Sequence, residues 1–500
     1  MAIIGVTSSA SWAIIQTLTD LRARLDEAQR QLRTGEKSET YAGLGPERAL
    51  VVGLQAQLDA AAGFEDTIAR VGTRLSLAQL SLNTIYDAAR TVKQTVVQPS
   101  FVLSGGGKTI DQQTALGQLE IMLSALNAQD ATGYMFSGLS PDRRATATLT
   151  QLLDGDGSRA GLKQVISERR LADVGDGLGR LVIPAAAGSV VSVSEDVAGS
   201  PFGFKLAGAS SSLTGANITG PGGVPPAISV DFTANPNAGE TFTLTLTLPD
   251  GTSENITLTA TAANPPGPNQ FTIGPTAAAT AANFQAALTA AVSKLADTSL
   301  VAASAIAAAN NFFDIDAANP PQRVNGPPFD TATSLVDGTA ADTVMWYTGE
   351  AGASPARSTA QARVDSSFTI AYGMRANEDA LRTAVKNTAV FVTMAFSPGD
   401  PDAAAQYSAL ASRLAANFVP PPGGQTITGL SSEIASAQVM LDNAKERHQQ
   451  ATVTLTDLLQ RITRVPPEQA GAELLALQTA LQASLQTTAM LSRLNLVNFL

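Results

Sequence analysis

The sequence predicts an α+β fold in which long antiparallel terminal helices form a coiled-coil rod and a central, mostly β insert forms an outer domain. Both ends of the 500-residue chain repeat apolar residues at steps of three and four, which places one apolar stripe on each helix. The middle of the chain is rich in Gly, Pro, Thr and Ser and contains alternating strand patterns. Because an apolar stripe must pack against another helix, the two ends are expected to pair.

A first helix is predicted over residues 9–34, with a serine cap before it and Gly35 after it. A polar connector follows as far as Pro46, a residue suited to the first turn of a second helix. The second helix is predicted to reach about Val97. Roughly fifty residues of helix would be about 75 Å long at 1.5 Å per residue, a length that favours a rod over a compact globule. The stripe of the first helix comprises Ile14, Leu18, Leu21, Leu25, Ala28 and Leu32.

The middle of the chain begins after a third helix, which is predicted at about 109–128 behind the glycine break at 104–107. Alternating residues at 241–248 and 256–259 flank a Pro-Asp-Gly turn and predict a β-hairpin. A further strand is predicted at 190–194, and the alanine-rich residues 276–309 are expected to be helical.

Four more helices are predicted near the C-terminus, separated by proline-containing breaks. They span residues 377–397, 402–418, 428–465 and 468–497. The predicted domains are therefore terminal helices at 1–45 and 466–500, a helical rod at 46–140 and 371–465, and an outer domain or domains at 141–370. The apolar residues expected to form the assembly interface are Ile14, Leu18, Leu21, Leu25, Leu32, Leu441, Leu455, Leu458, Ile462, Leu474, Leu477, Leu481, Leu485, Leu491 and Leu494.

The composition excludes several function classes. A formal net charge of −11, with no cluster of Lys and Arg, argues against nucleic-acid binding. The absence of cysteine excludes disulfides and thiolate chemistry, and a single histidine excludes multi-histidine zinc sites. No cleavable signal peptide and no membrane-spanning run of about 18 apolar residues is recognised.

No arrangement of residues predicts an enzyme, a cofactor site or a metal site. The run 104–109 ends like a phosphate-binding loop, but Val102 stands where that motif needs glycine, so a glycine break is favoured. His448 lies on the C-terminal stripe and is expected to pack with its ring nitrogens partnered. Trp346 and Tyr347 are expected in a core, whereas Glu168, Arg169, Arg170 and Asp173 are expected on a solvated face.

Four segments resemble the bacterial flagellin family, which includes flagellin and the hook–filament junction protein (hook-associated protein 3). Residues 17–35 are similar to the flagellin segment that ends in a glycine turn, and 41–45 resemble an α-proteobacterial subgroup. Residues 133–138 resemble the turn that leaves the helical domain, and 491–500 resemble the apolar C-terminus of the family. Their order along the chain, more than any one motif, carries the resemblance.

The resemblance implies an extracellular, non-enzymatic subunit of the flagellar filament that self-assembles through its terminal helices for swimming motility. It also implies type III export without signal cleavage, and partners that comprise other copies of the chain, hook-associated junction and cap proteins and an export chaperone. No cofactor, nucleic acid or membrane is implied. One alternative is the junction protein itself, which residues 346–350 and 363–365 resemble, and a remote alternative is a secreted adhesin or enzyme on a helical stalk.

Overall fold

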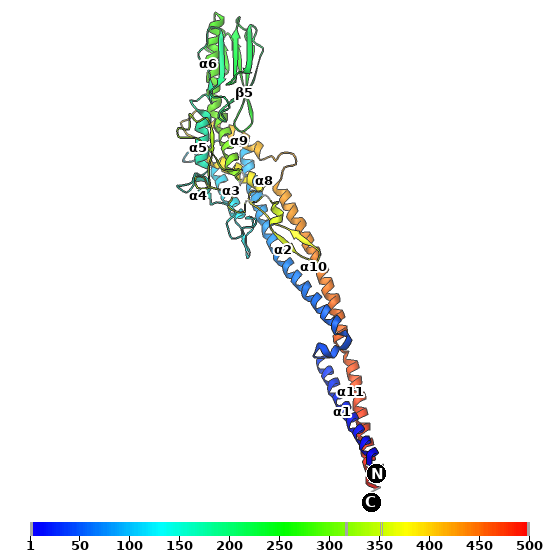
Figure 1. The fold of residues 1–500 in the computed structure, drawn as a ribbon. Coiled ribbons are helices and arrows are strands. Elements are labelled where there is room, and N and C mark those ends of the chain that lie inside the picture. Colours follow the sequence, from blue (N-terminus) through cyan, green and yellow to red (C-terminus); the bar gives the residue numbers. More distant parts are fainter. Residues whose placement is uncertain (1–3, 316–318, 351, 353, 498–500) are drawn as a thin grey trace. The chain divides into compact units, whose positions relative to one another are not determined.

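The computed structural model of the chain describes residues 4–315, 319–350, 352 and 354–497, and the side chains among them from residue 12 to residue 490. It confirms a mixed α+β fold with helices at both ends and a β region in the centre (Figure 1). The chain forms two compact units. We call residues 1–72, 363–369 and 439–500 the terminal unit, and residues 73–362 and 370–438 the sheet unit.

The terminal unit is built from helices. Helix α1 (Ile4–Thr34) packs along α11 (Pro467–Val497), as Figure 1 shows in blue and red. The short helix η1 (Tyr41–Glu47) leads into α2 (Arg48–Val97), whose first half belongs to this unit with most of α10 (Ile427–Thr463).

Two four-stranded sheets form the β region of the sheet unit. One has the strand order β10-β9-β8-β5 and the other β3-β4-β7-β6, and all neighbours are antiparallel except β10, which is parallel to β9. The strands are β3 (Leu181–Val182), β4 (Val190–Glu195), β5 (Lys205–Ser211), β6 (Ala216–Gly222), β7 (Ala227–Phe232), β8 (Thr241–Thr247), β9 (Ser253–Thr261) and β10 (Gln270–Thr272).

Helix α6 (Ala277–Leu295) packs against strands of both sheets, and the strand pattern explains why. In β8 every second residue is buried, so that Phe242, Leu244 and Leu246 face the core while the threonines between them are half-buried. These side chains join Phe284 of α6 in one apolar cluster shared by the two sheets.

The helix that starts as α6 continues through a π-helical turn (Ala296–Leu300) into α7 (Val301–Phe313). Residues Ala277–Phe313 are long and apolar enough to cross a membrane by length and composition, although 56% of the most apolar window is buried within the structure. Since α6 and α7 supply much of the core of the sheet unit, we interpret them as core helices.

The sheet unit contains further helices and short hairpins, and residues 363 and 369 of the last hairpin belong to the terminal unit. These elements are the helices α3 (Ile110–Leu126), α4 (Leu149–Asp154), α5 (Leu162–Val174), η3 (Ala356–Thr359), α8 (Asp379–Thr393) and α9 (Ala403–Asn417), with the hairpins β1 (Gln129–Asp130)–β2 (Gly133–Tyr134), β11 (Gln322–Val324)–β12 (Leu335–Asp337) and β13 (Gln361–Arg363)–β14 (Thr369–Ala371). Helix α7 contacts α5, α8 and α9.

The predicted elements agree closely with this structure. Every long helix predicted near the two ends is present within about five residues at either end, and the hairpin around Pro249-Asp250-Gly251 is confirmed as β8–β9. Residues 141–370 contain more helix than expected, because α4 and α5 precede the strands and α7 extends past residue 309. The three predicted domains, 1–45 with 466–500, 46–140 with 371–465, and 141–370, stay a prediction.

Candidate assembly interface

The apolar residues predicted near the start of the chain lie on α1, and those predicted near its end lie on α10 and α11. In α1, Ile14, Leu18, Leu21 and Leu25 are half-buried and Ala28 is buried. Half-buried residues also recur along α11, and they are Leu474, Leu477 and Leu481. Since α1 and α11 contact each other, each stripe already covers part of the other within a single chain.

Two more of the predicted interface residues hold α10 against α2 in the terminal unit. Ile462 is buried and Leu455 is half-buried in one apolar cluster with Val51 and Leu54 of α2. Leu441 is also buried. These side chains stabilise the fold of the chain itself and leave little apolar area exposed.

A different set of apolar side chains is exposed on the terminal helices. Of the predicted residues, Leu32, Leu458 and Leu485 are exposed, while the side chains of Leu491 and Leu494 lie outside the described part of the chain. Exposed residues that the heptad pattern does not select are Trp12, Ile15, Val453, Leu475 and Met490. Trp12, Leu475 and Met490 are 74%, 64% and 65% exposed. The signal that could have identified them is a large apolar residue beside the stripe rather than on it.

Helix α1 ends at a glycine that takes a left-handed conformation. Gly35 has a φ of 71°, and its N–H donates to the Gln31 carbonyl at 2.7 Å, which closes the last turn. A side chain with a Cβ is disfavoured at such a φ, so glycine is the residue suited to this position.

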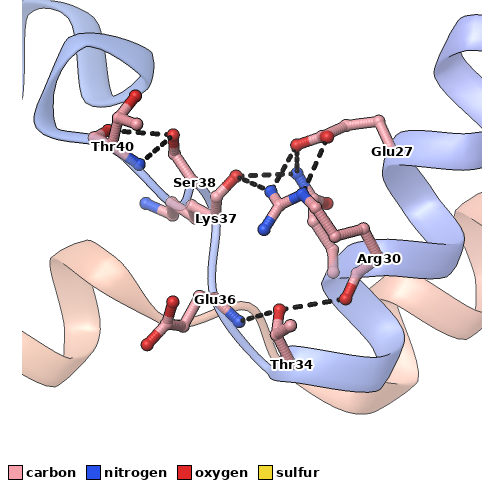
Figure 2. Close-up of polar contacts among 8 residues, drawn as sticks. Glu27, Arg30, Thr34, Glu36, Lys37, Ser38 and Thr40 are labelled. Atoms are coloured by element: carbon pink, nitrogen blue, oxygen red, sulfur yellow. Dashed lines mark hydrogen bonds and ion pairs between the residues drawn. The ribbon is translucent and has the colours of Figure 1, made fainter.

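Side chains of the last turns of α1 hold the connector that follows, as Figure 2 shows. Arg30 and Gln31 both donate to the carbonyl oxygen of Lys37, at 2.9 and 3.0 Å. Glu27 orients both donors by accepting from Arg30 and from Gln31. The hydrogen bond from Arg30 lowers the pKa of the Glu27 carboxyl, so this carboxylate stays charged at neutral pH.

The connector is also tied to the break between α10 and α11. The Lys37 N–H donates to the Thr463 carbonyl at 2.8 Å, and the Val465 N–H donates to the Gly35 carbonyl at 3.0 Å. Together with the antiparallel bridge between Glu36 and Arg464, these bonds form a short ladder between two segments of the same chain. Both helical arms of the terminal unit are therefore interrupted at the same level.

His448 is buried in the terminal unit, and its predicted packing is confirmed. Its ring stacks on Phe64, with centroids 5.2 Å apart, and its Nε2 lies 2.8 Å from the Val364 carbonyl oxygen. Val364 is itself buried, and Arg447 forms an ion pair with Asp365 at 3.3 Å. These contacts fasten the turn at residues 363–369 to α10, and they fasten α10 to α2, within this unit.

The glycine-rich run at 104–109 caps a helix. Lys108 donates through Nζ to the carbonyls of Val392, Thr393 and Met394 at 2.6–2.8 Å, at the C-terminal end of α8. Gln112 donates to two carbonyls of the same end. A cation at a helix C-terminus interacts favourably with the helix dipole and satisfies carbonyls that have no partner in the helix. The ammonium group is thus occupied with a structural role.

Lys108→Met is expected to destabilise the sheet unit by about 1–3 kcal/mol, because three carbonyls lose a charged donor. Burial also lowers the pKa of Lys108 to about 8. Between pH 8 and the ordinary pKa near 10.5, the unfolded chain therefore holds a proton on Lys108 that the folded chain has released. The unfolding free energy of the wild type is expected to increase as the pH rises through this range, and the variant is expected to lack this increase.

Denaturant unfolding of both proteins at pH 7, 8, 9 and 10 measures the two effects. The control is Lys445→Met, which changes an exposed lysine of α10 and is expected to shift stability by less than about 0.5 kcal/mol. Equal unfolding free energies for Lys108→Met and Lys445→Met would contradict the capping role.

The expectation of a solvated face at residues 168–173 is wrong for two of its members. Glu168 is buried and accepts from Arg323 at 2.6 Å, and Asp173 is buried and pairs with Arg169 at 2.8 Å. Both carboxylates lie on α5 where it packs against α7, so burial required partners for their charges. Trp346 and Tyr347 are buried, as predicted.

The candidate site is thus a surface of the terminal helices. Among the described residues, no group of three or more His, Cys, Asp or Glu side chains is arranged to hold a metal ion. Comparison with protein-family models gives no match, and comparison with curated proteins gives none either.

Proposed function

We propose that this chain is a flagellin-type structural subunit that assembles through its terminal helices into an extracellular filament. The observation that carries the proposal is the set of apolar side chains exposed on α1 and α11, among them Trp12, Ile15, Leu475 and Met490, beside a stripe that is already paired. Large apolar side chains that stay exposed on such a helix pair are available for a contact with another protein chain.

The charge distribution supports the same proposal. Residues 1–45 carry five basic and five acidic side chains, and residues 466–500 carry one basic and two acidic ones, whereas the whole chain has a net charge of −11. The two terminal segments are therefore close to neutral, and copies of them can approach one another without strong repulsion. The acidic remainder of the chain keeps free subunits soluble.

We further propose that α1 and α11 form an antiparallel coiled coil in the assembled subunit. Their half-buried residues recur at steps of three and four, the spacing that lets two helices interlock. A surface that contacts a different surface on the next copy repeats without closing, and such contacts build helical filaments. Export without a cleaved signal, and the junction, cap and chaperone partners, belong to this proposal through the family resemblance.

The test is polymerisation of the purified chain. Seeded growth at neutral pH is expected to give long filaments in electron micrographs, whereas a chain without residues 470–500 is expected to stay monomeric with its sheets folded by circular dichroism. Assemblies that form only as short caps on isolated hooks would instead assign the junction role. Filaments formed equally well by the truncated chain would contradict assembly through the terminal helices.

A further inference from the structure

A cavity of about 360 Å³ lies in the sheet unit, where the β8–β9 turn meets helices α7, α8 and α9. This volume is at the lower end of the range for small-molecule sites. Its polar lining comes from four separate elements and includes Asp250, Glu254, Asn310, Lys386, Ser412 and Asn417. It is built entirely from residues outside the terminal helices.

One of the two cations in this cavity is fully neutralised. Arg413 of α9 donates to Asp250 at 3.2 Å and to Glu254 at 2.8 Å. The side chains of Arg413 and Asp250 are nearly inaccessible to solvent. This ion-paired group therefore fixes the β8–β9 turn against α9 and has no charge left for a ligand.

The second cation has a different environment. Lys386 of α8 donates through Nζ to the Oδ1 atom of Asn310 at 2.7 Å, and among the described residues it forms no ion pair. Asp314 and Asp379, the two carboxylates whose charges act on Lys386, are both bound to Arg382 one turn earlier on α8. Burial lowers the pKa of Lys386, which reflects the lack of a close counter-charge.

Asn310 adds a second donor at the same place. Since its Oδ1 accepts from Lys386, its amide NH₂ group remains as a donor of a residue that lines the cavity. An ammonium and an amide NH₂ side by side match the two oxygens of a carboxylate, and hydrogen bonds between charged groups are the stronger kind. The cavity also has polar groups that can form hydrogen bonds with the hydroxyl groups of a ligand. They belong to Ser412, Asn417 and the partly exposed carboxylate of Glu254.

We propose that this cavity binds a small hydroxylated carboxylate of the sugar-acid class, with its carboxylate on Lys386 and Asn310. The ligand's hydroxyl groups face Ser412, Asn417 and Glu254. Neutral sugars lack the group that Lys386 recognises, and larger polyanions meet the carboxylates of Asp250 and Glu254. The binding site is independent of polymerisation, so it goes beyond the proposed structural function.

Calorimetric titration of D-glucuronate into the unassembled full-length chain at pH 7 tests the proposal, with D-glucose as the neutral probe. The wild type is expected to bind glucuronate with a millimolar Kd and glucose at least about tenfold more weakly. Lys386→Met is expected to weaken glucuronate binding by about tenfold or more, and Lys386→Arg is expected to retain it. Lys445→Met serves as the matched control and is expected to bind as the wild type does.

Asn310→Asp provides a second variant that keeps the fold, because the new carboxylate can pair with Lys386. It is expected to abolish glucuronate binding while leaving the unfolding transition in place. Absence of glucuronate binding by the wild type, or binding by Lys386→Met and Asn310→Asp as strong as that of the wild type, would overturn the proposal. Since binding is measured on single subunits, either result is separate from the outcome of the polymerisation test.

Discussion

Replacing Leu475 and Leu485 together by glutamate is expected to stop filament growth at concentrations where the wild type polymerises. Both leucines are exposed on α11. Full burial of a leucine contributes about 1.5–3 kcal/mol, and roughly half of each side chain is still available to be buried by a neighbour. Loss of this burial free energy at two positions is expected to raise the critical concentration by at least about tenfold. The free-energy cost of burying two carboxylates raises the critical concentration further.

Sedimentation of polymer from monomer across a concentration series measures this critical concentration. The control is Val224→Glu, which makes the same kind of change at a valine that is 87% exposed in the turn between β6 and β7. It adds an acidic group to the sheet unit and is expected to leave polymerisation unchanged. Helical content by circular dichroism should be the same in all three proteins, since exposed positions contribute little to the fold. Normal filament growth of the double variant would show that the exposed leucines of α11 are not part of the contact between copies.

Phe284→Ala is expected to lower the unfolding free energy of the sheet unit by about 3–5 kcal/mol. Phe284 is fully buried on α6, and its ring lies 5.0–5.4 Å from the rings of Phe232, Phe242 and Phe271. Two of these rings belong to one sheet and one to the other, so the truncation leaves a cavity where both sheets meet α6.

Differential scanning calorimetry resolves the effect if the two units melt separately, and near-ultraviolet circular dichroism reports on the aromatic core. Phe368→Ala, at a phenylalanine that is 38% exposed, is the matched control and is expected to cost less than about 1 kcal/mol. Polymerisation of Phe284→Ala below the melting temperature of its sheet unit is expected to be retained. A stability loss equal to that of Phe368→Ala would contradict the role of Phe284 as the centre of this core.

The terminal helices and the main hairpin could be predicted because the signals for them are local. A period of three and four, a proline at the first turn and glycine after the last turn are visible in sequence alone, and α1, α10 and α11 follow them. The alternation around Asp250 is equally local, and β8 and β9 pair in the register it implies.

What could not be predicted depends on contacts between distant segments. The periodicity identifies Leu477 as a stripe residue, but only the pairing of α1 with α11 shows that it is partly covered while Leu475 beside it is exposed. Glu168 reads as a surface residue until Arg323, 155 positions later, supplies its partner. Lys108 likewise reads as part of a flexible break, because the helix end that it caps lies 284–286 positions further along the chain.

The ladder between residues 35–37 and 463–465 joins two segments of opposite stiffness. Gly35 is the residue with the widest backbone freedom, whereas Pro466 and Pro467 have φ fixed near −65°. The prolines follow the ladder residues directly, so the backbone has less freedom on their side than at Gly35, and two backbone hydrogen bonds link the two sides. A change of direction at this level is therefore easier for the segment at Gly35 than for the segment that leads into Pro466 and Pro467. The two hydrogen bonds keep the end of α1 beside the start of α11.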